Sequence, residues 1–129
     1  MEHTNNLIIN NINGFNDLVY MDDNNNVIET NTIIFKLCGK VINEPTRISI
    51  QIGKDMHIED PYGQYMNHSC NPTCYIKDGA VYSLQNITKN TSLTFDYNEN
   101  EDCMSTPFKC NCCQQIIAGK NKKIDVPII

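Results

Sequence analysis

Short apolar runs divide the chain of 129 residues, and turn-forming residues separate each run from the next. Residues 33–38 are mostly β-branched and aromatic, and residues 47–52 alternate strictly between polar and apolar side chains. Both patterns are typical of strands that bury one face, so we expect the isoleucines of residues 47–52 to face the core. No window of eleven or more residues has the spacing of an amphipathic helix. The sequence therefore predicts a mostly-β domain of many short strands.

Turns and strands can also be predicted locally. Asp78 and Gly79 separate two extended runs, which is a strong signal for a β-hairpin. Residues 14–17 are predicted to form a turn that leads into a strand at residues 18–21. Residues 93–97, with the sequence LTFDY, are predicted to form a strand. In that strand Leu93, Phe95 and Tyr97 share one face and Asp96 lies on the other.

Length and charge limit the class of protein. A chain of 129 residues fits one domain, and ten basic against fifteen acidic residues give a net charge of −5. This balance is unfavourable for direct nucleic-acid binding, which needs clustered Lys and Arg. It suits a basic partner, such as a lysine-rich protein tail.

The start of the chain and its cysteines indicate the compartment. No basic segment followed by an apolar run opens the sequence, and no stretch is long enough to cross a bilayer. We therefore expect an intracellular protein, cytoplasmic or nuclear, that is neither secreted nor bound to a membrane. Seven cysteines, an odd number, argue against a disulfide framework and favour free thiols or a metal site.

The richest cluster of polar side chains is the segment NHSCNP at residues 67–72. Pro72 fixes its own φ and favours an extended conformation for Asn71, so this segment is predicted to be a bend. A bend with so many polar groups is costly to bury without partners. Taken alone it is most simply a polar surface loop.

Two later segments change this interpretation: LTFDY at residues 93–97 and Cys-Asn-Cys at residues 110–112. With NHSCNP, and in this order, they resemble a SET domain, the fold of protein-lysine methyltransferases. The resemblance covers roughly residues 14–119. It implies one domain over residues 1–129, with a core of about residues 14–100 and a cysteine-containing tail of about residues 101–119.

The family fold is a set of several small, curved β-sheets with a C-terminal pseudoknot, one of the rare knot-like chain crossings. The resemblance therefore implies that Asn67 and His68 lie beside Tyr97, although a long stretch of chain separates them.

The resemblance also implies a reaction, the transfer of a methyl group from S-adenosylmethionine to a lysine of a protein substrate, such as a histone or another basic protein. In-line transfer depends mainly on positioning. Tyr97 is predicted to be the catalytic residue. It is a poor candidate for a simple base, because a tyrosine pKa near ~10 leaves little phenolate at pH 7. The alternative is a core tyrosine at the end of a strand.

Several residues are predicted to bind the cofactor by resemblance. His68 would act partly through its backbone against the adenine, and Phe108 would cover the ring. The alternatives are stabilisation of the bend for Asn67 and His68, and simple core packing for Tyr65 and Phe108. The full predicted set is Asn67, His68, Tyr65, Tyr97, Phe108 and Gly14.

The cysteines resemble the family's zinc-binding tail, in which four thiolates hold one Zn²⁺. The family's last tail cysteine would fall where Ile117 stands, so Cys113 is the substitute that a shortened tail would use. Cys74 and Cys103 are further alternatives, and unligated thiols acting as small hydrophobes are another. The predicted metal ligands are Cys70, Cys110, Cys112 and Cys113.

Two departures from the family pattern support a second hypothesis. Gly14 stands alone where the family usually has Gly-x-Gly, and Leu37 replaces a tyrosine that often lines the lysine channel. The chain could therefore be a SET-type module that has lost turnover and acts in protein interaction.

A methyltransferase that acts on a small molecule or on a residue other than lysine is a third hypothesis. A small domain of this kind could also form a homodimer to complete its site.

Overall fold

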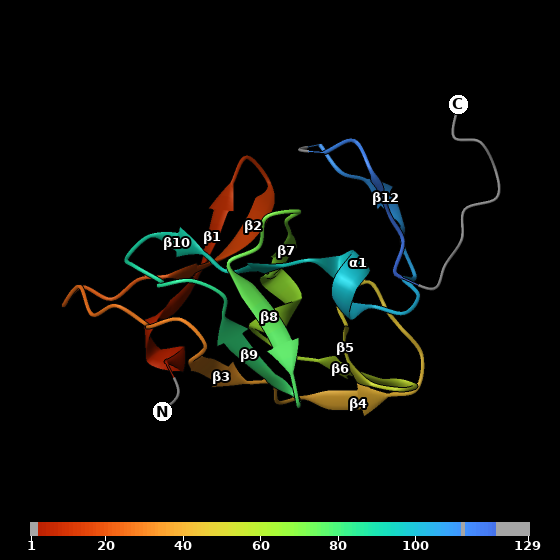
Figure 1. Cartoon of the computed structure of the whole chain (residues 1–129), viewed down its shortest axis with the longest axis horizontal. Coiled ribbons are helices and arrows are strands. Elements are labelled where there is room, and N and C mark those ends of the chain that lie inside the picture. The colour runs from red at the N-terminus through yellow and green to blue at the C-terminus, as the bar shows by residue number, and fades with distance from the viewer. Residues whose placement is uncertain (1–2, 112, 121–129) are drawn as a thin grey trace.

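The computed structural model describes residues 3–111 and 113–120, and within them thirteen strands form five small sheets (Figure 1). This confirms the predicted fold class of several small β-sheets. The helical segments are the short 3₁₀ helices η1 (Thr4–Asn6) and η2 (Gly63–Tyr65) and the single-turn helix α1 (Tyr97–Asn100). None of these described helices approaches the ~20 residues that cross a bilayer.

The first sheet has the order β1-β2-β10, with β1 at Leu7–Ile12, β2 at Phe15–Tyr20 and β10 at Thr91–Ser92. Asn13 and Gly14 join β1 to β2, and both have positive φ, 53° and 84°. Two such residues make the tight hairpin turn that matches the twist of antiparallel strands. The turn predicted at residues 14–17 is therefore displaced, because β2 already begins at Phe15.

The second sheet has the order β3-β9-β8, with β3 at Ile33–Lys36, β8 at Cys74–Lys77 and β9 at Ala80–Ser83. The hairpin predicted at Asp78 and Gly79 is confirmed. These two residues have φ values of 51° and 73°, and β8 pairs antiparallel with β9.

The third sheet has the order β4-β6-β5, with β4 at Lys40–Ile42, β5 at Ile50–Gly53 and β6 at Met56–Glu59. Ile50 is 2% exposed, whereas Ile48 is 40% exposed. The prediction that the isoleucines of residues 47–52 face the core is thus right for Ile50 and wrong for Ile48. Residues 46–49 form a turn, in which the Thr46 backbone N–H donates to Ser49 Oγ at 2.8 Å.

A short parallel pair joins β7 (Asn67–His68) to β11 (Thr94–Phe95). The strand predicted over residues 93–97 ends at Phe95, because Tyr97 begins α1 instead. Asp96 caps this helix by accepting a hydrogen bond from the Asn98 backbone N–H at 2.9 Å. The prediction that Tyr97 shares a strand face with Leu93 and Phe95 is therefore wrong.

The core lies where the first three sheets and the β7–β11 pair meet. Apolar side chains from eight of the thirteen strands exclude water from it, so that short strands that could not be stable alone stabilise one another. Its buried members are Leu7, Leu18, Tyr20, Ile28, Ile34, Phe35, Ile50, Ile58, Met66, Cys74, Val81, Ile87, Leu93 and Phe95.

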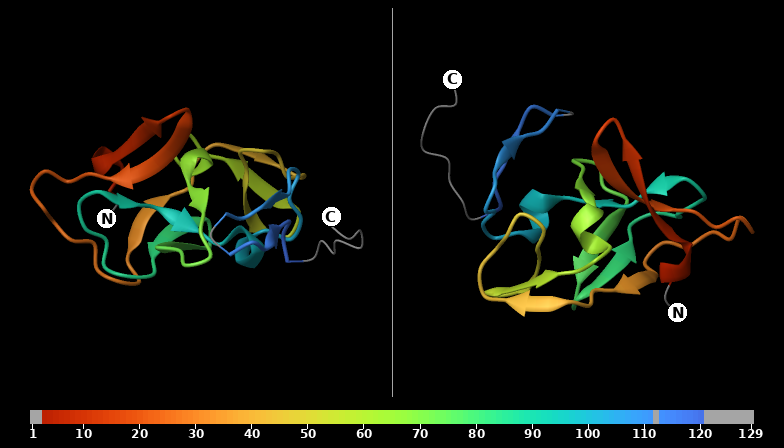
Figure 2. Two further views of the ribbon diagram at one scale, coloured as in Figure 1. Left: turned by 90° about the horizontal axis from the view of Figure 1, so that it is seen from above. Right: turned by 180° about the vertical axis from the view of Figure 1, so that it is seen from behind.

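The tail forms a small hairpin of β12 (Phe108–Lys109) and β13 (Ile116–Ile117). The Asn98 carboxamide holds its end against α1: Oδ1 accepts from the backbone N–H groups of Ala118 and Gly119, each at 3.0 Å, and Nδ2 donates to the Ile116 carbonyl at 3.2 Å. The β1–β2 hairpin and this tail project from the same side of the molecule, with β7 between them (Figures 1 and 2).

Gly39 is predicted to be essential for the third sheet. A Cβ atom there would lie 2.0 Å from the Glu59 carbonyl oxygen, so that β4 could not approach β6. We expect Gly39→Ala to lower the free energy of unfolding by about 2 kcal/mol or more, measured by urea denaturation. In the same sheet Gly53→Ala is the control, since its Cβ would meet only the Met56 side chain, at ordinary distances of 3.5 Å or more. Equal losses in the two variants would contradict the proposed clash.

Candidate active site

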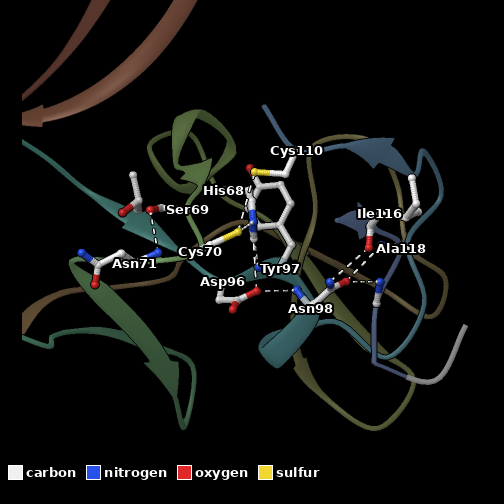
Figure 3. Close-up of polar contacts among 12 residues, drawn as sticks. His68, Ser69, Cys70, Asn71, Asp96, Tyr97, Asn98, Cys110, Ile116 and Ala118 are labelled. Carbon is white, nitrogen blue, oxygen red and sulfur yellow. Dashed lines mark hydrogen bonds and ion pairs between the residues drawn. The ribbon is translucent and has the colours of Figure 1, made fainter. Parts of the chain in front are cut away.

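The parallel pair β7–β11 brings His68 and Tyr97 together, as the resemblance implied. His68 Nδ1 accepts a hydrogen bond from the Tyr97 backbone N–H at 3.1 Å, and the two rings lie edge to face with centroids 5.3 Å apart (Figure 3). Burial lowers the pKa of His68, although the Asp96 carboxylate acts in the opposite direction. The imidazole is therefore a neutral acceptor that fixes the start of α1.

The Tyr97 hydroxyl donates to the Met66 carbonyl at 2.5 Å. Its proton is thus committed, and the lone pairs of its oxygen remain available to another donor. Burial raises the pKa of Tyr97 to about 12, and the nearby Glu101 carboxylate adds to the effect. Tyr97 is therefore a phenol at neutral pH, which agrees with the view that it is not a simple base.

Asn67 is the first residue of the bend at residues 67–72, directly before His68, and its side chain is exposed. Its Nδ2 donates to the Asn16 carbonyl at 2.9 Å, and lies 3.4 Å from Asp17 Oδ1. The carboxamide therefore links β7 to β2. Because Nδ2 is turned toward β2, the side chain stabilises the bend, and its oxygen has no recorded partner among the described residues.

Phe108 of the tail completes an aromatic group with His68 and Tyr97. Its ring centroid lies 6.0 Å from that of His68 and 6.1 Å from that of Tyr97, both edge to face. Phe108 is 39% exposed, so the group has an open side. Such a group is chemically suited to a flat aromatic ligand.

Two residues that were predicted to bind the cofactor, Tyr65 and Gly14, lie outside the aromatic group of His68, Tyr97 and Phe108. Tyr65 is partly buried and packs against the core. Gly14 forms the tip of the β1–β2 hairpin, and a Cβ added there would meet nothing within 4 Å. The turn alone explains this glycine, because its φ of 84° is unfavourable for other residues. The structure does not place either residue in the group around Tyr97.

A pocket opens beside Tyr97. Apolar side chains of Ile50, Met66 and Phe95 line it together with Tyr97 and Glu101. The turn at residues 45–49 and the tail residues 104–106 form much of the remaining wall.

Sequence reasoning missed Glu101 as a site residue. Asp96 and Glu99 have the spacing of a helix N-terminus, with a cap and an acid three residues later. That signal would have placed Glu101 one turn after Tyr97.

A candidate metal site lies on the other side of His68, at Cys70 and Cys110. Cys70 Sγ lies 3.7 Å from Cys110 Sγ, close to the ~3.8 Å that two thiolates of a tetrahedral zinc site would have for Zn–S bonds of about 2.3 Å. His68 Nε2 lies 3.3 Å from Cys70 Sγ, and the three donor atoms lie within 4.8 Å of one another. Two thiols thus already have the spacing that zinc requires.

The other cysteines considered as metal ligands do not join Cys70 and Cys110 in the described residues. Cys112 lies outside the described residues. Cys113 is half-buried and is not among the donors that meet there, as far as the described residues show. Cys74, an alternative from the sequence, lies in the core, where burial raises the pKa of its thiol to about 11. Its position is that of a small apolar side chain.

His68 is not suited to bind the metal itself. Its Nδ1 accepts from a backbone N–H, so a neutral ring must carry its proton on Nε2. A protonated Nε2 has no lone pair for a metal, but it can donate a hydrogen bond to the Cys70 sulfur. The imidazole therefore joins the Tyr97 backbone to the thiol pair.

Comparison with known proteins shows which sequences this chain is similar to. The sequence profile of the SET domain family matches residues 10–98. A histone-lysine N-methyltransferase of Gibberella zeae, named as H3 lysine-36 specific, is 29% identical over 126 aligned residues, which cover 74% of this chain and 14% of that protein.

Two further relatives match shorter segments. Histone-lysine N-methyltransferase ASHH2 of Arabidopsis thaliana is 33% identical over 78 residues, covering 51% of this chain and 4% of that protein. Histone-lysine N-methyltransferase SETD1B of Homo sapiens is 34% identical over 62 residues, covering 40% of this chain and 3% of that protein. The chain therefore spans only a small part of the length of these relatives.

The raised pKa of Tyr97 predicts a pH dependence of stability. The folded state binds the phenol proton more tightly than the unfolded chain, so this contribution is complete below the ordinary pKa of 10 and is lost as the pH rises to about 12. We expect the free energy of unfolding to fall less steeply over this range in Tyr97→Phe than in the wild type, measured by urea denaturation at each pH. Parallel curves would show that Tyr97 ionises with an ordinary pKa.

Proposed function

Because the chain belongs to the SET domain family, we propose that it is a protein-lysine methyltransferase that uses S-adenosylmethionine. The observation that best supports this function is the position of Tyr97: its hydroxyl bonds the Met66 carbonyl beside an open pocket, and its backbone N–H bonds His68 of a segment far away in the sequence. A structural tyrosine such as Tyr20 also bonds its hydroxyl, but it would need no adjoining pocket.

The proposed substrate is a lysine of a histone or of another basic protein. Relatives from a fungus, a plant and a mammal are all named histone-lysine methyltransferases. The net charge of −5 favours association with a lysine-rich partner. The target lysine would enter the pocket beside Tyr97, between the turn at residues 45–49 and the tail residues 104–106.

Tyr97 would orient the reacting amine. S-adenosylmethionine supplies a methyl group on a sulfonium, so that a C–N bond to lysine forms as the C–S bond breaks. The Tyr97 oxygen, whose proton is held by the Met66 carbonyl, can accept a hydrogen bond from the lysine nitrogen. An amine held in this way has fewer orientations open to it, which is the main source of rate in such a transfer.

The apolar wall of the pocket would help the lysine to lose its proton. Ile50, Met66 and Phe95 are each at most 3% exposed. Burial beside such side chains disfavours an ammonium relative to a neutral amine, whose lone pair is the nucleophile. The wall also keeps water away from the reacting atoms.

The residues around Tyr97 fit the cofactor in part. The ring group of His68, Tyr97 and Phe108 offers aromatic faces and edges to an adenine, and Asn67 lies at the end of the same bend. These residues would hold the nucleoside. Roles for Tyr65 and Gly14 stay predictions, as do the homodimer, the intracellular location and the division of the chain into a core and a tail.

We further propose that the tail binds zinc through Cys70 and Cys110, with Cys112 and Cys113 as the other predicted ligands. The 3.7 Å between the first two sulfur atoms supports this. The ion would join the bend after β7 to the tail that carries Phe108. Its role would be structural, since four thiolates leave no open position.

The alternative function is a SET-type module that has lost turnover and acts in protein interaction. The single glycine of the β1–β2 turn and the absence of a cysteine at position 117 favour it. The two functions differ in whether the cofactor binds and reacts, which one variant can test.

Tyr97→Phe should separate chemistry from binding. We expect wild type and variant to bind S-adenosylmethionine similarly in calorimetry, and the variant to lose about 100-fold or more of its methyl transfer to histones, because only the hydroxyl is removed. Tyr82→Phe is the control, since its ring stacks on Tyr75 away from the site. No heat of binding with the wild type would favour the inactive module, and full activity of Tyr97→Phe would remove the hydroxyl from the mechanism.

The zinc proposal predicts a coupled loss of metal and stability. Cys110→Ser should lose most of the bound zinc in elemental analysis and lower the melting temperature, because metal binding contributes to folding free energy. Cys38→Ser, at an exposed thiol in another part of the chain, should retain both. Wild-type protein prepared without chelators that contains no zinc would refute the metal site.

A further inference from the structure

Glu101 is a buried acid that the proposed mechanism does not use. It is 5% exposed, and it lines the pocket beside Tyr97. Its backbone N–H donates to the Tyr97 carbonyl at 2.9 Å, at the end of α1. A carboxyl group at this depth is costly unless it has partners.

The partners of Glu101 satisfy one of its oxygens. Oε2 accepts from the Gln51 backbone N–H at 2.9 Å and from Asn100 Nδ2 at 2.6 Å. Oε1 has no recorded partner among the described residues. Oε1 can therefore accept a hydrogen bond from a ligand, although Glu101 is almost completely buried.

A hydrogen-bonded frame fixes the carboxyl group. Gln51 Oε1 accepts from the Asp102 backbone N–H, and Gln51 Nε2 donates to Asp102 Oδ2, each at 2.7 Å. Asn100 Nδ2 also donates to the Gln51 carbonyl at 3.0 Å. The frame ties α1 to β5, so Glu101 has little freedom to turn away from the pocket.

Two of the polar side chains that line the pocket, Tyr97 and Glu101, have an oxygen free to accept. The Tyr97 hydroxyl proton is given to the Met66 carbonyl, so its oxygen presents lone pairs, as does Glu101 Oε1. Arg47 is the basic residue in the pocket wall, and it is exposed. The two acceptors on Tyr97 and Glu101, beside the apolar wall, are therefore complementary to a cation with several N–H donors on an apolar stem.

We propose that Glu101 binds the ammonium group of the arriving lysine, before the amine loses its proton, and selects lysine over uncharged side chains of similar shape. This inference rests on the proposed function and adds a second contact to the one from Tyr97. Burial raises the pKa of Glu101, and a bound cation would favour its ionised form. The frame around Oε2 holds the acid in place for this contact.

A pair of matched probes tests the inference. N-acetyl-lysine methylamide and N-acetyl-norleucine methylamide differ only in the terminal ammonium, and their affinities can be measured by NMR titration without cofactor. We expect the wild type to bind the lysine probe about tenfold or more tightly than the norleucine probe. Glu101→Gln keeps the size of the side chain and an oxygen acceptor, and we expect it to bind both probes equally within about twofold.

Glu99→Gln is the matched control. It makes the same change two residues away, at an exposed residue of α1 outside this pocket, and it should keep the wild-type preference for lysine. Equal binding of the two probes by the wild type, no binding of the lysine probe, or a preference that survives in Glu101→Gln would each overturn the inference. If Glu101→Gln fails to fold, Glu101→Asp, which keeps the charge but shortens the reach, should retain part of the preference.

The measurement separates this inference from the proposed function, because it needs neither S-adenosylmethionine nor turnover. Ammonium selectivity without methyl transfer would support Glu101 and count against the enzyme. For an active enzyme, Glu101→Gln should raise KM for the protein substrate about tenfold, whereas a purely structural residue would leave KM unchanged in variant protein that is fully folded.

Discussion

The parallel pairing of β7 with β11 is the contact on which the site depends. It consists of two residue pairs, Asn67 with Thr94 and His68 with Phe95, extended by the hydrogen bond from the Ser69 N–H to the Phe95 carbonyl. So short a pair is not stable alone, and the surrounding core must hold it. Because α1 begins two residues after Phe95, this pairing also sets where the Tyr97 hydroxyl meets the Met66 carbonyl.

The local parts of the fold could be predicted from the sequence. Asp78 and Gly79 specify a hairpin because both can adopt positive φ, and the mostly-β class follows from short alternating runs. The predicted strand bounds were wrong where a side chain hydrogen-bonds the backbone and ends the strand. Asp96 ends β11 by starting a helix, and Ser49 accepts from the Thr46 N–H, which turns the chain before β5 begins. Alternation of residue types does not report such local hydrogen bonds.

The candidate site could be predicted only through resemblance. No periodicity places the segment at residues 67–70 beside Tyr97, because the two meet through the long-range pairing of β7 with β11. The resemblance named His68 but not its position between the Tyr97 N–H and the Cys70 sulfur, which depends on the orientation of one ring. Glu101 was missed because it lies outside every motif, and only the turn of helix after Asp96 reveals that it returns to the pocket.

The Asn98 carboxamide has a consequence for how the molecule responds to change. It holds the end of the tail through three hydrogen bonds, and it directly follows Tyr97 in the chain. The tail and the phenol are therefore mechanically coupled through a single helical turn. A disturbance of the distal hairpin would be transmitted to the Tyr97 hydroxyl even if no residue of the pocket were altered.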